Sequence, residues 1–213
     1  MQQTTSSKRI AIYGGTFDPI HRGHLEPLRS VVEKMGWHRV ILVPAFVQPF
    51  KVGQKISSRF HRFAMAILAT AGDARFEVSP IELETQEVSY SVDTLRAFVA
   101  ENPDASFEWV IGDDNLERLM RWREIGAILE LANFVVLTRN GAAVPEELSD
   151  RVVDPTGRKY SGQIVMTDNE RFDSSGTDIR RLVASGKDVR DLVGDEIAEY
   201  IGRYRLYHPE EEN

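Results

Sequence analysis

The chain has 213 residues, enough for one domain to bury a substantial core without covalent cross-links. It contains no cysteine, which excludes disulfides, thiolate metal sites and cysteine nucleophiles and fits a cytoplasmic location. The formal net charge of −7 argues against a nucleic-acid partner, and no apolar run approaches the ~20 residues of a membrane span. We expect a single domain over residues 8–207, with flexible tails at 1–7 and 208–213.

The first predicted elements are a strand, a glycine turn and a helix. Residues 10–13 are apolar strand formers, which suits a strand buried on both faces of a parallel sheet. Gly14 and Gly15 follow directly, and they allow a sharp turn and close approach of backbone N–H groups to an anion. Residues 22–36 then show helical spacing, with Leu25, Leu28, Val31, Val32 and Met35 on one face.

Two histidines, His21 and His24, stand at the beginning of this helix. Helix N-termini favour phosphate, and two imidazoles three residues apart can face the same phosphate. Either feature alone is most often structural, so the prediction of a nucleotide-phosphate site depends on their coincidence with the glycine turn. The same histidines could share a metal in a hydrolase, but the sequence offers no third ligand.

Strands and helices continue to alternate along the chain. Further strands are predicted over residues 39–44, 75–80, 107–111, 133–138 and 163–167. Helices are predicted from residue 57, over 91–100, within 116–131, and over 178–184 and 195–204. This order predicts an α/β protein with a doubly wound parallel sheet, a small C-terminal helical segment, and ligands at the carboxyl ends of the strands.

Other segments carry a weaker pattern. The helix that begins at Ser57 has Phe60, Phe63, Ala64, Ile67 and Leu68 on one face. Residues 45–55 are interpreted as a loop, 81–88 as an acidic connection and 140–162 as an irregular excursion.

Three polar clusters accompany these elements. Residues 175–180 place hydroxyl groups and Arg180 at a helix start, where the hydroxyls can cap the helix and the set can bind a polyphosphate. Residues 89–95 also suit a capped helix start. Residues 112–115 follow a strand at the edge where a doubly wound sheet offers its ligand site.

The stretch GGTFDPIHRGH resembles the signature of the adenylyltransferase branch of the nucleotidyltransferase superfamily, whose mark is an H-x-G-H motif. Within that branch the chain is most similar to bacterial nicotinate-nucleotide adenylyltransferases. Their second signature, Ile-Ser-Ser-Thr-x-Ile-Arg, is matched by Ser175, Thr177, Ile179 and Arg180, whereas Ser174 replaces the isoleucine and Gly176 the second serine. SYSVDTL and LVGDEIAEYIGRYRLY are also similar, so the resemblance runs from residue 10 to 207.

The resemblance implies a Rossmann-like nucleotidyltransferase fold and adenylyl transfer from ATP to nicotinate mononucleotide in NAD biosynthesis, with Mg²⁺ bound to ATP and no dedicated protein ligands for a metal. The implied catalytic residues are His21, His24, Lys51 and Arg180. The implied ATP-binding residues are Gly14, Gly15, Thr16, Phe17, His21, His24, Gly112, Asp114, Ser175, Thr177 and Arg180. The implied nicotinate-nucleotide-binding residues are Thr16, Lys51, Tyr90, Ser91, Asp93, Thr94 and Trp122.

Two departures from the family leave alternatives open. Phe50 stands where the family usually has histidine, and Glu84 stands where basic residues are common. Both remove positive or donor groups near the expected substrate. One alternative is a sibling adenylyltransferase that uses nicotinamide mononucleotide or phosphopantetheine. Another is a regulatory nucleotide-binding protein with little turnover. The oligomeric state is left open.

Overall fold

The computed structural model describes residues 8–85, 87–139, 141–153 and 162–209. Within these ranges the protein forms one seven-stranded sheet in the order β3-β2-β1-β4-β5-β7-β6, and every pair of neighbouring strands is parallel. The strands are β1 (Arg9–Gly15), β2 (Arg39–Pro44), β3 (Phe76–Val78), β4 (Ser106–Gly112), β5 (Ala132–Leu137), β6 (Val152–Val153) and β7 (Ile164–Thr167). The predicted doubly wound parallel sheet is confirmed.

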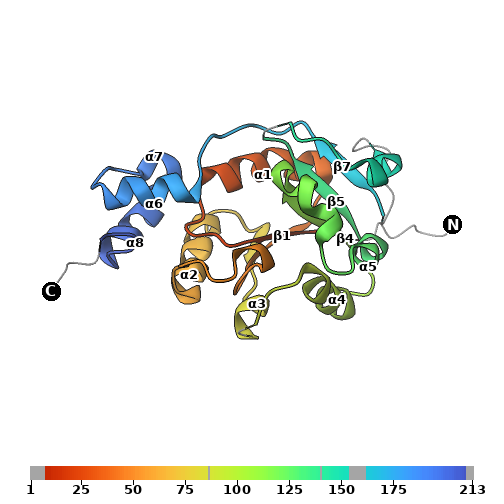
Figure 1. Cartoon of the computed structure of the whole chain (residues 1–213), viewed down its shortest axis with the longest axis horizontal. Coiled ribbons are helices and arrows are strands. Elements are labelled where there is room, and N and C mark those ends of the chain that lie inside the picture. The colour runs from red at the N-terminus through yellow and green to blue at the C-terminus, as the bar shows by residue number, and fades with distance from the viewer. Residues whose placement is uncertain (1–7, 86, 140, 154–161, 210–213) are drawn as a thin grey trace.

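Helices join these strands and cover the sheet on both faces (Figure 1). The α-helices are α1 (Arg22–Met35), α2 (Arg59–Thr70), α3 (Ile81–Glu84), α4 (Ser91–Glu101), α5 (Ile125–Leu131), α6 (Gly176–Ala184), α7 (Arg190–Val193) and α8 (Asp195–Arg203). The 3₁₀ helices of the described ranges are η1 (Pro49–Lys51), η2 (Asp113–Arg121) and η3 (Glu146–Arg151).

The alternation of side chains along β1 explains why two layers of helices are needed. Ala11 and Tyr13 belong to a core shared with α1, α2 and the C-terminal helices, whereas Ile10 and Ile12 belong to a core shared with α4 and α5. Because successive side chains of a strand point to opposite faces, an apolar run requires cover on both sides. The face predicted for α1 is buried as expected.

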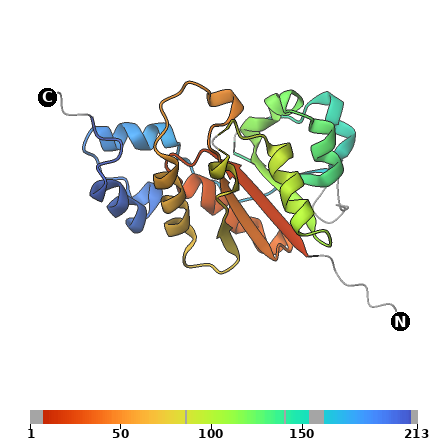
Figure 2. The same ribbon diagram turned by 90° about the horizontal axis from the view of Figure 1, so that it is seen from below.

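The C-terminal helices lie together at one end of the molecule (Figure 1). There α8 packs against α2, as Figure 2 shows from below. This confirms a C-terminal helical segment that belongs to one of the two cores. The division into a single domain at 8–207 stays a prediction, and residues 1–7 and 210–213 of the predicted tails lie outside the described residues.

The apolar face expected on α2 is not the buried one. The helix buries Arg62, Met65 and Ala66, while Phe60 is 69% exposed and Ile67 is 44% exposed. Periodicity identifies an apolar stripe, but here the orientation of the helix follows from Arg62, whose guanidinium is bonded to backbone carbonyls at the core. The predicted buried stripe was therefore wrong in register by two residues, which is roughly 200° around the helix.

Short helices also occur where loops were predicted. Segment 45–55 contains η1, the connection 81–88 contains α3, the excursion 140–162 contains η3 and β6, and α7 precedes α8. Elements of two to six residues carry too few periods for an amphipathic pattern to be read, so local turn geometry and tertiary contacts decide them. Residues 140 and 154–161 of the excursion lie outside the described residues.

Candidate active site

A pocket of about 720 Å³ opens at the carboxyl ends of the central strands, where a doubly wound sheet places its ligands. It is lined from β1, the start of α1, η1, the start of α4, η2 and the start of α6. Fifteen of the predicted site residues line it, namely Gly14, Gly15, Thr16, Phe17, His21, His24, Lys51, Tyr90, Ser91, Gly112, Asp114, Trp122, Ser175, Thr177 and Arg180. The fold therefore brings nearly all of them together.

The glycine turn is required by the packing of Phe17. A Cβ atom on Gly15 would lie 2.6 Å from the Phe17 ring, so a side chain at position 15 would displace that ring. Phe17 itself is fully buried, with a positive φ of 49°, and its ring meets His24 edge to face at a centroid distance of 5.2 Å. The turn thus supports His24 through the ring of Phe17.

The two histidines stack at the beginning of α1, with ring centroids 3.7 Å apart. His21 is the N-cap residue, and its Nδ1 atom lies 2.8 Å from the Ser174 hydroxyl. The Nδ1 atom of His24 is buried without a hydrogen-bond partner among the described residues, so that ring is held by packing. Gly23 separates them because a Cβ there would lie 2.7 Å from the Ser174 hydroxyl oxygen.

Burial keeps both imidazoles neutral. Burial, aided by the positive charge of Arg139, lowers the pKa of His21 to about 3. Burial, followed by the neighbouring His21, Arg139 and Lys51, also lowers the pKa of His24 well below its usual value. Neutral imidazoles present one N–H donor each, which suits them to hold a phosphate oxygen by hydrogen bonding rather than by charge.

Cations gather opposite the histidines. Lys51 Nζ donates to Thr16 Oγ1 at 3.1 Å, and that hydroxyl donates to Gln48 at 2.8 Å. Burial and then the neighbouring Arg180 lower the pKa of Lys51. Arg180 donates to the Asp18 carbonyl at 2.6 Å and to Thr177 Oγ1 at 3.2 Å. A lysine whose pKa is lowered by burial and by a neighbouring guanidinium favours an anionic ligand.

The start of α6 closes against the loop that follows β1. Ser175 caps the helix by accepting from the Asp178 backbone N–H at 3.1 Å, as its position predicted. Gly176 lies so close to this loop that a Cβ would sit 3.0 Å from the Asp18 carbonyl oxygen. The small residue at 176, a departure from the family signature, therefore has a steric reason in this chain.

Tyr90, Ser91 and Trp122 also line the pocket. The Trp122 ring meets Phe134 edge to face at 5.8 Å. Asp93 and Thr94 are not among the described residues that line the pocket. Thr94 donates to the buried Glu82 carboxylate at 2.6 Å, and Asp93 pairs with Arg123 at 3.5 Å. These contacts brace α4, and the predicted binding role of both residues stays a prediction.

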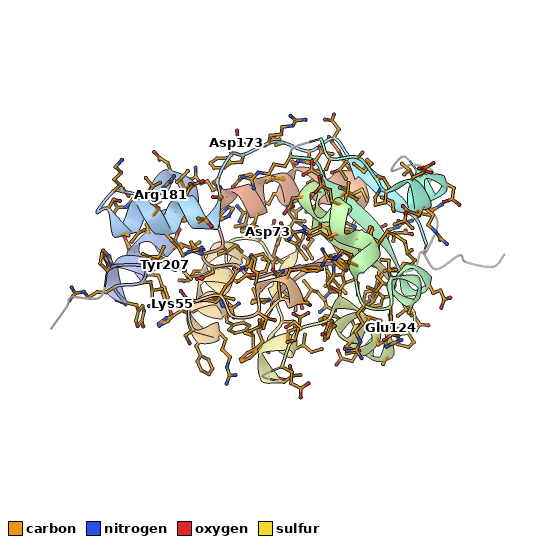
Figure 3. All side chains as sticks on the ribbon, in the orientation of Figure 1. Lys55, Asp73, Glu124, Asp173, Arg181 and Tyr207 are labelled. Atoms are coloured by element: carbon orange, nitrogen blue, oxygen red, sulfur yellow. The ribbon has the colours of Figure 1, made fainter. Side chains whose placement is uncertain are left out.

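Several residues that support the pocket were missed from the sequence. Arg62 is buried and donates to four carbonyl groups around the pocket loops. Tyr207, labelled in Figure 3, donates to Asp18 Oδ1 at 2.7 Å, while the Ser57 N–H donates to Oδ2 at 3.1 Å. Burial raises the pKa of Tyr207, and the charge of Asp18 adds to that effect. Asp18 lies inside the quoted signature, which was the one available signal.

The described part of the chain holds no group of three or more His, Asp or Glu side chains that could bind a metal ion. No helix within it is long and apolar enough to cross a membrane.

A parallel sheet with a pocket of phosphate-binding groups at the carboxyl ends of its strands is typical of a nucleotide-binding enzyme. Comparison with known proteins gives the class of enzyme. The family model described as cytidylyltransferase-like matches residues 12–182. The protein is thus a nucleotidyltransferase. A solved structure of the Plasmodium falciparum nicotinic acid mononucleotide adenylyltransferase, complexed with NaAD, has the same fold, with a TM-score of 0.72 and 19% identity over 94% of this chain and 97% of that one.

Curated bacterial relatives are closer in sequence. The Symbiobacterium thermophilum relative is 37% identical over 199 residues, covering 93% of this chain and 95% of its own length. The Roseiflexus castenholzii relative is 38% identical over 202 residues, covering 95% and 99%. Both carry the name “Probable nicotinate-nucleotide adenylyltransferase”. The chain belongs to the nicotinate-nucleotide adenylyltransferase family.

Proposed function

We propose that this protein transfers the adenylyl group of ATP to nicotinate mononucleotide, giving deamido-NAD and pyrophosphate. The observation that carries the proposal is the convergence of His21, His24, Lys51 and Arg180 in the pocket that also contains Trp122. The pocket offers donors and cations for phosphates and an aromatic ring for a pyridine base. Family membership supports the same reaction.

The chemistry needs no protein nucleophile. A phosphate oxygen of nicotinate mononucleotide attacks the α-phosphorus of ATP in line, a new P–O bond forms, and the bond to the β-phosphate oxygen breaks. Pyrophosphate leaves with that electron pair. Catalysis is then a matter of positioning the two phosphates and of stabilising charge that develops on the oxygens.

Four polar residues and one aromatic residue of the pocket have a role in this scheme. The neutral His21 and His24 donate N–H groups to phosphate oxygens, since both pKa values are lowered by burial. Lys51 and Arg180 neutralise the negative charge that shifts toward the leaving pyrophosphate. Trp122 stacks on the nicotinate ring, and the glycine turn of β1 brings backbone N–H groups to the nucleotide.

A divalent metal ion enters with the nucleotide in this proposal. Mg²⁺ would be held by the triphosphate and by water and would neutralise part of the phosphate charge, so it would need no cage of protein carboxylates. MgATP is thus a substrate rather than a complex assembled by the protein. A cytoplasmic location, where ATP is abundant, belongs to the same proposal.

A pyrophosphate-release assay tests the function. The protein is supplied with MgATP and, separately, with nicotinate mononucleotide, nicotinamide mononucleotide or phosphopantetheine. We expect the highest kcat/KM with nicotinate mononucleotide, and loss of the signal with His24→Ala prepared in the same way excludes a contaminating enzyme. A preference for another acceptor would replace the substrate assignment. Release with none of them would favour a regulatory nucleotide-binding protein.

A further inference from the structure

Ser174 lies in the segment between β7 and α6 and reaches across to the beginning of α1. Its hydroxyl oxygen accepts from the Gly23 backbone N–H at 3.1 Å and lies 2.8 Å from His21 Nδ1. Ser174 is 8% exposed and His21 is 2% exposed, so this contact is shielded from water. The resemblance to the family signature places isoleucine at position 174, so the hydroxyl is a feature of this chain.

The Ser174 hydroxyl has one hydrogen-bond acceptor for its proton among the described residues. Serine carries a single O–H donor and two acceptor lone pairs, and the Gly23 N–H already occupies one lone pair. Within the described residues, His21 Nδ1 is the one acceptor in hydrogen-bond range of Ser174 Oγ. If Nδ1 carried a proton, the buried serine O–H would lose its partner, which is the costlier arrangement.

We propose that Ser174 is a positioning residue that holds His21 in the tautomer with its proton on Nε2. That tautomer leaves the Nε2–H as the donor that His21 offers to the pocket it lines. The consequence for catalysis rests on the proposed function, in which this N–H holds a phosphate oxygen. The tautomer itself does not depend on that function.

Two observations support the placement of Ser174. The Arg139 guanidinium donates to the Ser174 carbonyl at 2.6 Å, which anchors the backbone of Ser174. Burial keeps His21 uncharged, so the choice between two neutral tautomers is a real one. The hydroxyl therefore links the second signature segment to the first histidine of the H-x-G-H motif.

The test is ¹⁵N NMR of histidine-labelled protein at neutral pH, with the His21 signals assigned by their absence in His21→Ala. We expect one protonated nitrogen in wild type, at Nε2, and a mixture of the two tautomers in Ser174→Ala. We also expect kcat for adenylyl transfer to fall about two- to tenfold in Ser174→Ala, in proportion to the share of His21 in the wrong tautomer, which lacks the donor. The KM for ATP should change by less than about threefold.

Ser30→Ala is the matched control. Ser30 also links α1 to the segment before α6, since it accepts from the Glu170 N–H at 3.0 Å and donates to the Pro27 carbonyl at 2.8 Å. Because Ser30 lies outside the pocket, its loss should leave the His21 signals and kcat unchanged.

A wild-type His21 protonated on Nδ1, or charged, would overturn the proposal even if Ser174→Ala did not fold. An unchanged tautomer in folded Ser174→Ala would overturn it as well. If the NMR spectra are as expected but the protein does not transfer adenylyl groups, the role of Ser174 in setting the His21 tautomer stands and the proposed function is rejected.

Discussion

Replacing Arg62 by methionine tests whether the pocket loops depend on one buried cation. Its guanidinium donates to the carbonyl groups of Thr16 at 2.7 Å, Ala45 at 2.6 Å, Phe46 at 3.2 Å and Ser57 at 3.0 Å. These carbonyls belong to the turn after β1, the end of β2 and the approach to α2. The residue is 1% exposed, so water cannot take its place.

The expected loss follows from these bonds. A hydrogen bond from a charged donor contributes about 1.5–3 kcal/mol, and four of them would exceed the stability of many domains. Burial of the cation offsets much of that gain, since a buried ion costs several kcal/mol of hydration. We therefore expect Arg62→Met to lower the free energy of unfolding by about 3–5 kcal/mol, because four buried carbonyl groups lose their donor at about 1–3 kcal/mol each while the cost of burying a cation is removed.

Urea denaturation, followed by tryptophan fluorescence, measures this change if the slope stays constant between variants. Because Thr16 also contacts Lys51, kcat/KM should fall at least about tenfold in the same variant. Arg59→Met on the same helix is the control. Its guanidinium stacks on Phe46 and Phe60, and its loss should cost less than about 1 kcal/mol. Equal stability of Arg62→Met and Arg59→Met would refute the reasoning.

Three further predictions concern the pocket. His24→Ala should lower kcat by roughly 10² to 10³ while the Kd for ATP, measured by calorimetry, changes little, because a preorganised donor acts mainly in the transition state. Trp122→Ala should raise KM for the mononucleotide by an amount equal to about 1–3 kcal/mol of stacking without raising KM for ATP; a large drop in Tm with normal substrate constants would instead indicate a core residue. The third concerns pH. Burial lowers the pKa of His21 to about 3, so between pH 6.5 and 3 the unfolded chain binds more protons than the folded one. The free energy of unfolding should fall as pH decreases, by up to about 1.4 kcal/mol per pH unit from this group, and His21→Asn should flatten that slope in urea titrations.

The parts predicted well from the sequence are those with a local cause. The apolar run of β1, its glycines and the one-sided periodicity of α1 are short-range patterns, and the structure has the strand, turn and helix where they indicate. The order of strands and helices then predicted the parallel sheet and a ligand site at the carboxyl ends of its strands. Ser175 was readable as a cap because capping depends on neighbours within one turn.

The parts that were missed depend on contacts between distant segments. Arg62 reads as an ordinary polar residue on an amphipathic helix, and nothing nearby in sequence reveals that it meets the Thr16 carbonyl 46 positions earlier. Ser174 and His21 are 153 positions apart, so the serine could be noted only as a departure from a signature. The binding role of Thr94 and Asp93 comes from a motif alone and stays a prediction, while in the structure their side chains contact Glu82 and Arg123, respectively.

Phe50 shows why a departure from a motif has to be judged in space. Read along the chain, it removes a histidine and its positive charge from the substrate loop. In the structure, Arg118 and Arg121 of η2 place their guanidinium carbons 5.7 Å and 5.3 Å from the centre of the Phe50 ring. Both arginines line the pocket, and neither forms an ion pair with another residue of the described chain. The aromatic ring at position 50 holds two cations at the site where the family has one imidazole, so the positive charge is supplied by a different element. The other departure, Glu84, is an exposed residue of α3 outside the pocket lining, and it removes nothing from the site within the described residues.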